Sequence, residues 1–206
     1  MKDNIIIIDY GMGNLHSVKR KFYKMGINVE ISSDTKDILY ANKIIIPGVG
    51  HFRKAVENLK KLNLWEPLNE VALIKKIPVL GICLGMQLMA GHSEEGNESG
   101  LGWIDADVIR FKISNILKHK IPHMGWNNVR LHKPSRLFEG IPENSEFYFV
   151  HSYHLNCFNE TEVLCYTDYE YDFVSAVEKG NIFGVQFHPE KSHDTGEKFL
   201  MNFANL

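Results

Sequence analysis

The chain has 206 residues, which suits one domain, and its 44% of hydrophobic residues is ample for a core. A formal net charge of −2 argues against a surface built to bind nucleic acid. The three cysteines (Cys83, Cys157 and Cys165) are an odd number without a C-x-x-C pair, which argues against a disulfide framework or a zinc knuckle.

The first half of the chain alternates strand and helix signals. Residues 4–8 are expected to form a strand, because the apolar β-branched run that follows Asn4 is typical of a strand buried on both faces. Their four isoleucines are too few for a signal peptide or a membrane span, so we expect a cytoplasmic protein without a membrane partner. Asn14 can cap a helix that runs to about Met25 and closes at Gly26.

The same alternation continues to residue 82. We expect strands at residues 27–31, 43–46 and 79–82, and helices at residues 52–61 and 65–75. Strands that alternate with helices predict a parallel sheet with helices on both faces. Ligand sites in such sheets lie beyond the carboxyl ends of the strands, where both the loop at residues 47–50 and Cys83 fall.

The second half of the chain changes character. Residues 92–100 are polar and contain glycine, which predicts a surface loop. Short strands are expected at residues 147–150, 162–166, 173–177 and 182–187, before a closing helix at residues 194–203. The predicted fold is therefore α/β: one domain over residues 1–206, with an open, mostly parallel sheet, helices on both faces and antiparallel edge strands.

Cys83 lies at the centre of a G-x-C-x-G pattern, residues 81–85, directly after the predicted strand at 79–82. The pattern is that of a strand-to-helix nucleophile elbow with cysteine in place of serine. The glycines suit a strained apex that packs closely against its neighbours, and the N-terminus of the following helix favours a thiolate. The alternative interpretation is a buried structural cysteine in a glycine-containing turn.

A cysteine nucleophile needs a base and a group that orients the base. His188 and Glu190 are two residues apart, so in extended backbone they project to the same side, with Pro189 stiffening the link. The carboxylate would hold the imidazole tautomer and stabilise the imidazolium. A structural histidine beside a surface glutamate is the alternative.

The loop at residues 47–50 carries Gly48 and Gly50, which let backbone N–H groups approach a ligand and point the same way. This geometry suits an oxyanion hole, to which the N–H of Leu84 could contribute a second donor. An ordinary glycine turn would give the same sequence.

Two other patterns are weaker. Residues 9–14 resemble the start of a dinucleotide-binding loop, but position 16 is His16 where the third glycine is required. His151, His154 and Cys157 have the three-residue spacing of a helical metal site, yet the surrounding sequence indicates strand or loop. We therefore predict no metal and no cofactor, and interpret Cys157 and Cys165 as small core or strand residues.

Taken together, residues 81–85 and 187–190 resemble the class I (triad-type) glutamine amidotransferases, and the resemblance covers nearly the whole chain. More specifically, the chain is similar to the glutaminase subunits of imidazole glycerol phosphate synthases. The segments that carry this similarity are residues 47–52, 122–127, 148–153 and 186–192. The resemblance implies a flavodoxin-like arrangement of the α/β fold.

The resemblance also implies roles for individual residues. Cys83 would be the nucleophile, His188 the general base and acid, and Glu190 its orienter. Backbone of Val49 and Leu84 would form the oxyanion hole. The residues that would hold L-glutamine are Gly50, Gln87, His151, Ser152 and Tyr153. The residues that would lie near the partner interface are His123, Trp126, Tyr148 and Lys191.

The implied reaction is hydrolysis of L-glutamine to glutamate and ammonia. The ammonia would pass to a (β/α)8-barrel cyclase subunit in a heterodimer, which makes imidazole glycerol phosphate and aminoimidazole-carboxamide ribonucleotide in histidine biosynthesis. One alternative is a paralogue that feeds another synthase, such as one making an aminated sugar. The others are a stand-alone cysteine hydrolase and a nucleotide-binding module that uses residues 11–14.

Overall fold

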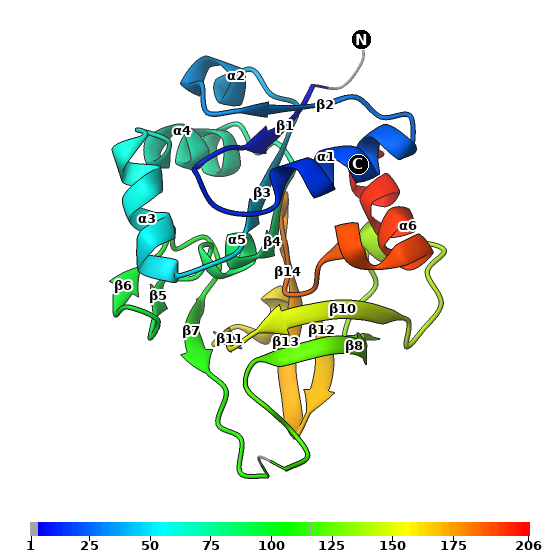
Figure 1. The fold of residues 1–206 in the computed structure, drawn as a ribbon. Coiled ribbons are helices and arrows are strands. Elements are labelled where there is room, and N and C mark those ends of the chain that lie inside the picture. The colour runs from blue at the N-terminus through cyan, green and yellow to red at the C-terminus, as the bar shows by residue number, and fades with distance from the viewer. Residues whose placement is uncertain (1–3, 116) are drawn as a thin grey trace.

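The computed structural model describes residues 4–115 and 117–206 (Figure 1). Its main sheet has the strand order β2-β1-β3-β4-β14-β13-β11-β7-β5-β6. Five neighbouring strands at one side run parallel: β2 (Val29–Ser32), β1 (Ile5–Ile8), β3 (Lys43–Gly48), β4 (Val79–Cys83) and β14 (Ile182–Val185). The predicted parallel sheet is therefore confirmed.

The other side of the main sheet is mostly antiparallel. It holds β13 (Tyr171–Lys179), β11 (Tyr153–Cys157), β7 (Ala106–Arg110), β5 (His92–Ser93), β6 (Glu98–Ser99), β12 (Val163–Tyr169) and β9 (Arg130–Leu131). This confirms the expected antiparallel additions. The expectation of a plain loop at residues 92–100 was wrong, because β5 and β6 pair there as a short hairpin and β5 also pairs with β7.

Two further strands form a separate antiparallel ribbon: β8 (His123–Asn128) and β10 (Glu146–His151). Residues 147–150 were expected at the edge of the main sheet, and this was wrong. In Figure 1 the ribbon crosses in front of β13 and β12, below α6. Its register places Trp126 opposite Tyr148 and His123 opposite His151, so residues from two distant segments meet here.

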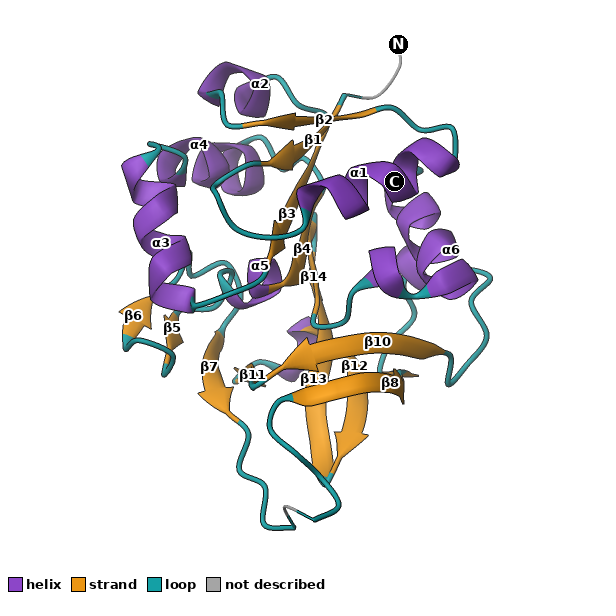
Figure 2. Ribbon diagram, viewed as in Figure 1, coloured by secondary structure: helices purple, strands orange, loops and turns teal. Residues whose placement is uncertain are grey.

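Helices cover both faces of the parallel strands, as predicted (Figure 2). Their bounds are α1 (Leu15–Lys24), α2 (Thr35–Leu39), α3 (Phe52–Lys61), α4 (Trp65–Asn69), α5 (Leu84–Gln87) and α6 (His193–Ala204). Apolar residues of α2, α3 and α4 join one buried cluster and those of α1 and α6 join another. No helix in the described residues is both long and apolar enough to cross a membrane.

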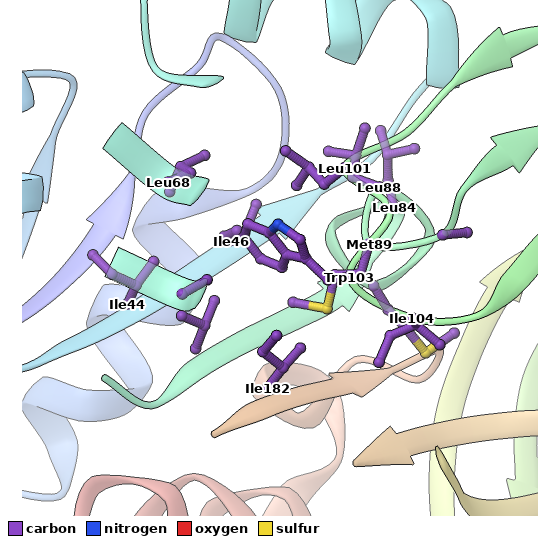
Figure 3. Close-up of a cluster of buried hydrophobic side chains, with 14 of the residues drawn as sticks. Ile44, Ile46, Leu68, Leu84, Leu88, Met89, Leu101, Trp103, Ile104 and Ile182 are labelled. Carbon is purple, nitrogen blue, oxygen red and sulfur yellow. The ribbon is translucent and has the colours of Figure 1, made fainter. Parts of the chain in front are cut away.

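Each central strand contributes apolar side chains to both buried clusters. Ile44 and Ile46 of β3 face the first cluster, whereas Ile45 faces the second, because successive side chains of a strand point to opposite faces. In the first cluster Trp103 lies close to Ile46 and Met89 (Figure 3). The indole N–H of Trp103 donates to Asn69 at 2.8 Å, so its burial leaves no donor unpaired.

Several element bounds differ from expectation for local reasons. Helix α2 was not expected from the sequence; its first turn is capped by the Asp34 side chain, which accepts from the N–H of Lys36 at 2.7 Å. Strand β3 continues through Pro47 and Gly48 instead of stopping at residue 46, and the hydroxyl of Tyr10 donates to the Pro47 carbonyl at 2.8 Å. The helix expected at 65–75 changes after α4 into a π-helical turn, Glu70–Ile74.

The elbow after β4 requires glycine, which has no side chain, at positions 81 and 85. A Cβ at Gly85 would lie 1.7 Å from the Ile46 carbonyl oxygen, and one at Gly81 would lie 2.6 Å from the Gly85 carbonyl oxygen. Both contacts are with backbone, which cannot move aside as a flexible side chain can. The glycines of the G-x-C-x-G pattern therefore allow α5 to pack directly on β3 and β4.

We expect Gly85→Ala to lower the free energy of unfolding by about 3 kcal/mol or more, because the added methyl group overlaps the backbone of β3. Urea unfolding followed by circular dichroism measures the change. Gly91→Ala is the matched control, since its Cβ would meet nothing closer than the Ala106 carbonyl oxygen at 3.7 Å. Equal stability of the two variants would contradict the close-packing explanation.

Candidate active site

Cys83 ends β4 and immediately precedes α5, with φ of +55° and ψ of −110°. Such a conformation costs a non-glycine residue about 1–3 kcal/mol and is found where the surrounding structure enforces it. The residue is 6% exposed. Helix α5 has only four residues, so it offers the backbone N–H groups of a single turn. The predicted elbow is present, with the cysteine side chain held at its apex.

His188 and Glu190 form the predicted pair. Nδ1 of His188 lies 2.8 Å from Oε1 of Glu190, and both side chains are at most 3% exposed. The backbone route differs from the extended strand we expected: β14 ends at Val185, and Glu190 lies in a 3-10 turn, Pro189–Lys191. Pro189 begins this turn, where a missing N–H does no harm.

The hydrogen bond between His188 and Glu190 has a defined direction, and the imidazole has a defined charge. A carboxylate only accepts, so Nδ1 of His188 carries the proton and donates. Nε2 is buried and has no conventional hydrogen bond within residues 4–115 and 117–206. Burial alone would lower the pKa of His188, but the nearby Cys83 and the hydrogen-bonded Glu190 outweigh it and raise the pKa to about 10. The imidazole is therefore protonated at neutral pH and suited to donate from Nε2.

A cavity of about 330 Å³ opens at the sulfur of Cys83. Its lining includes every residue assigned to the oxyanion hole or to substrate binding: Val49, Leu84, Gly50, Gln87, His151, Ser152 and Tyr153. These residues come from the ends of β3, β4, β10 and β11 and from α5. The elements meet at the carboxyl ends of the parallel strands, where a ligand site was expected.

Three further residues line the cavity without a role expected from the sequence: Glu95, Pro122 and Val150. Glu95 brings a carboxylate from the β5–β6 hairpin, and its Oε2 accepts from the backbone N–H of Phe52 at 2.8 Å. The carbonyl of Val150 lies 3.9 Å from Sγ of Cys83. Pro122 and Val150 fall within segments that carried the family resemblance, whereas the polar hairpin around Glu95 gave no such signal.

The four residues expected near the partner interface divide into two groups. His123 is 3% exposed, and both of its ring nitrogens bond within the chain, so its side chain is not available on the surface. Trp126 is 42% exposed and stacks on His193 with centroids 4.8 Å apart. Nζ of Lys191 lies 5.5 Å from the centre of the Tyr148 ring.

The two weaker patterns have structural roles. Within the described residues, no three of the His, Cys, Asp and Glu side chains gather closely enough to hold a metal ion. His154 bonds instead to the Leu155 carbonyl and the Tyr171 hydroxyl. In the loop at residues 9–14, the buried Tyr10 anchors Pro47, so this loop supports the wall of the cavity.

A strained cysteine, a buried histidine–carboxylate pair and a cavity lined by the cysteine form the arrangement that a hydrolase with a cysteine nucleophile requires. The sequence model of the "Glutamine amidotransferase class-I" family matches residues 6–205. The chain belongs to this family and is a glutamine amidotransferase.

Among curated proteins the chain is similar to those named imidazole glycerol phosphate synthase subunit HisH. It is 51% identical to HisH 2 of Methanococcus maripaludis, over 97% of this chain and 98% of that protein. It is 46% identical to HisH 1 of Campylobacter jejuni, over 98% of this chain and all of that protein. A solved structure of a glutamine amidotransferase from Thermotoga maritima shares the fold, with a TM-score of 0.65 and 17% identity over 100% of this chain and 84% of the other.

Proposed function

We propose that the protein is the glutaminase subunit of an imidazole glycerol phosphate synthase. It hydrolyses L-glutamine to glutamate and ammonia and supplies the ammonia to a (β/α)8-barrel cyclase in histidine biosynthesis. The observation that carries this proposal is that Cys83 lines a cavity large enough for an amino acid. Beside Cys83 lies His188, which is hydrogen-bonded to Glu190. The full-length similarity to HisH subunits supports the choice of acceptor.

Glutamine binding follows from the polar groups that line the cavity. Gln87 uses both N–H donors within the chain, on the Tyr153 carbonyl and on Gln186, which leaves its Oε1 to accept from a ligand. The Glu95 carboxylate supplies the negative charge that an α-ammonium group needs. These groups would orient glutamine with its side-chain amide toward Cys83.

The first chemical step is attack of the Cys83 thiolate on the amide carbon of glutamine. The charge that develops on the amide oxygen is stabilised by backbone N–H groups of residues 49 and 84, a contribution of about 3–4 kcal/mol for each donor. His188 gives its Nε2 proton to the departing nitrogen, which leaves as ammonia. A γ-glutamyl thioester on Cys83 remains.

The second step returns the enzyme to its starting state. Neutral His188 removes a proton from water through Nε2, and the hydroxide attacks the thioester carbon. The carbon–sulfur bond breaks, glutamate leaves and the thiolate–imidazolium pair is restored. Glu190 keeps the imidazole in one orientation throughout, because its bond to Nδ1 does not change between the two steps.

The partner surface that we propose is centred on Trp126, with Tyr148, Lys191 and His193 around it. A groove of about 430 Å³ lies beside Trp126 and His193. A second groove of about 340 Å³ shares Lys191 and His193 and continues along the basic face of α1; Arg20, Lys21 and Lys24 also line it. We therefore expect an aromatic-binding pocket rimmed with acidic side chains on the partner.

Trp126→Ala should raise the dissociation constant of the complex by tenfold or more, roughly 2 kcal/mol, because exposed tryptophans commonly dominate interface energies. Isothermal titration calorimetry with the barrel subunit measures it. Tyr40→Ala is the control, since Tyr40 is 81% exposed and follows α2 directly. Figure 1 shows α2 far from the ribbon, across the parallel strands. Equal affinities of the two variants would remove Trp126 from the interface.

The decisive assay is glutamate release from L-glutamine, in the presence and absence of the barrel subunit with its nucleotide substrate. We expect weak release by the isolated chain and strong stimulation by the complex, because uncoupled turnover would waste glutamine. Absence of glutamate under every condition would refute the proposed reaction. We also propose a cytoplasmic location, since a reducing compartment keeps the nucleophile a free thiol, as all three cysteines are here.

A second candidate is a paralogous glutaminase that feeds another synthase, such as one that makes an aminated sugar. Several of the similar proteins carry the numbered names HisH 2 or HisH 1, and this numbering is the observation that favours a second acceptor. The same triad would serve either acceptor. Co-purification of the native chain with its partner, followed by mass spectrometry, separates the two candidates.

A further inference from the structure

A continuous series of hydrogen bonds runs from strand β8 toward the cavity. Nδ2 of Asn127 lies 3.3 Å from Nε2 of His123, and Nδ1 of His123 lies 3.0 Å from Nε2 of His151. Nδ1 of His151 lies 2.8 Å from the carbonyl oxygen of Tyr153. The series therefore connects a strand outside the main sheet with the backbone turn that lines the cavity.

The same carbonyl begins a second series that ends at the nucleophile. Nε2 of Gln87 donates to the Tyr153 carbonyl at 3.0 Å and also to Oε1 of Gln186 at 3.0 Å. Nε2 of Gln186 then lies 3.5 Å from Sγ of Cys83. Gln186 is completely buried, directly after β14, so it has no water to satisfy its amide.

The direction of every bond in this series is fixed by the Tyr153 carbonyl, which can only accept. His151 must donate from Nδ1, so in its neutral form Nε2 accepts from His123. Nε2 of His123 is then an acceptor for Asn127. Both rings are neutral, because burial lowers the pKa of His151 well below its usual range, and burial together with His119 lowers that of His123 to about 4.

The Tyr153 carbonyl also fixes the orientation of the Gln87 and Gln186 side-chain amides. Gln87 must face Tyr153 with Nε2, and its second N–H then meets Oε1 of Gln186. Gln186 consequently presents its own N–H groups to Sγ of Cys83. A donor at this position stabilises a thiolate and fixes where the sulfur lies, whereas the opposite amide orientation would face the sulfur with an oxygen.

We propose that this series, from His123 through His151, the Tyr153 carbonyl and Gln87 to Gln186, positions the sulfur of Cys83. Gln186 and His123 are positioning residues, since neither is a cavity-lining residue. The inference rests on the proposed function only in taking Cys83 as the nucleophile. Gln186 and His123 are buried polar side chains that the triad itself does not require, and the positioning of the sulfur explains why they are present.

The test is the rate at which iodoacetamide alkylates Cys83 in the full chain, measured against pH by mass spectrometry of the peptide that contains it. Gln186→Met keeps the side-chain length but removes the donor, and we expect alkylation about tenfold slower with a shifted pH profile. His123→Phe keeps the ring but removes the Nδ1 donor, and it should slow alkylation in the same direction. His123→Asn should restore the rate, because its Nδ2 can donate from the place of Nδ1.

His154→Phe is the matched control. His154 is 4% exposed and packs in the same aromatic cluster, with its ring centroid 4.7 Å from that of Phe111, but it lies outside the series. It should lose stability in urea without changing the alkylation of Cys83. If His123→Phe does not fold, Gln186→Met decides the question from the other end of the series.

Wild-type alkylation rates and pH profiles in both Gln186→Met and His123→Phe would overturn the inference. So would a His123→Asn variant as slow as His123→Phe, since ring packing and not hydrogen bonding would then explain the effect. Failure of the proposed function has a different signature: the wild-type complex would release no glutamate, whatever the alkylation rates of the variants.

Discussion

Cys83→Ala is expected to abolish glutamine-dependent synthesis by the complex, a loss of roughly 10⁴-fold or more, because removal of a nucleophile eliminates the covalent route. Synthesis from added ammonium salt should continue at the wild-type rate. The chain then acts only as a scaffold, and ammonia reaches the acceptor subunit from solution. The measurement is product formation by the complex with glutamine or with ammonium chloride as nitrogen source.

Cys157→Ala is the matched control for this substitution. Burial and the nearby Glu162 raise the pKa of Cys157 to about 12, so this residue remains a thiol at neutral pH. It lies in β11, outside the cavity, and its replacement should leave both nitrogen sources equally usable. Retention of glutamine-dependent synthesis by Cys83→Ala would mean that another group attacks the substrate.

The predictable part of the site consists of residues whose local sequence carries the geometry. The G-x-C-x-G pattern specifies the elbow because each flanking glycine is needed where backbones touch, and these contacts lie within a few residues or on the neighbouring strand. The pairing of His188 with Glu190 was predicted correctly on an incorrect backbone, since a 3-10 turn brings them together in place of an extended strand. Two residues of separation leave little freedom for them to lie far apart.

The unpredicted part depends on contacts between distant segments. Gln186 looked like one more strand residue, and its contact with Cys83, 103 positions earlier, follows only from the adjacency of β14 and β4. His123 and His151 meet because β8 and β10 form a ribbon of their own, whereas the local pattern of residues 147–150 fits either sheet equally well. Glu95 lines the cavity because β5 and β6 form a hairpin there, whereas the polar sequence of this segment predicted a loop.

Glu190→Gln is expected to lower kcat/KM for glutamine hydrolysis by about 10³–10⁴-fold while the protein still folds, because an amide cannot stabilise the imidazolium or hold one tautomer. Hydrolysis is measured as glutamate release by the complex. The wild-type carboxylate is one of the groups that raise the pKa of His188 to about 10. The variant should therefore show a lower pKa for His188, measured from the imidazole signals in an NMR titration.

The same substitution should also change how the free energy of unfolding depends on pH. The raised pKa means that folded His188 holds a proton the unfolded chain releases between pH 6.5 and about 10. Stabilisation from this ionisation is complete below pH 6.5 and is lost as the pH rises through the folded pKa. In Glu190→Gln the folded pKa is lower, so the loss should be complete at a lower pH, as measured by urea unfolding across this range.

Glu197→Gln separates the orienting role from a general effect of removing a carboxylate. Glu197 pairs with Lys21 at 3.1 Å, and its side chain is 42% exposed, so its neutralisation should change stability by less than about 1 kcal/mol and leave hydrolysis intact. Wild-type hydrolysis and an unshifted His188 titration in Glu190→Gln would show that His188 needs no carboxylate. Because Oε2 of Glu190 is buried without a partner among the described residues, the amide of the variant gains no compensating hydrogen bond unless the site rearranges. Loss of activity with retained folding is therefore the result that identifies Glu190 as the orienting member of the triad.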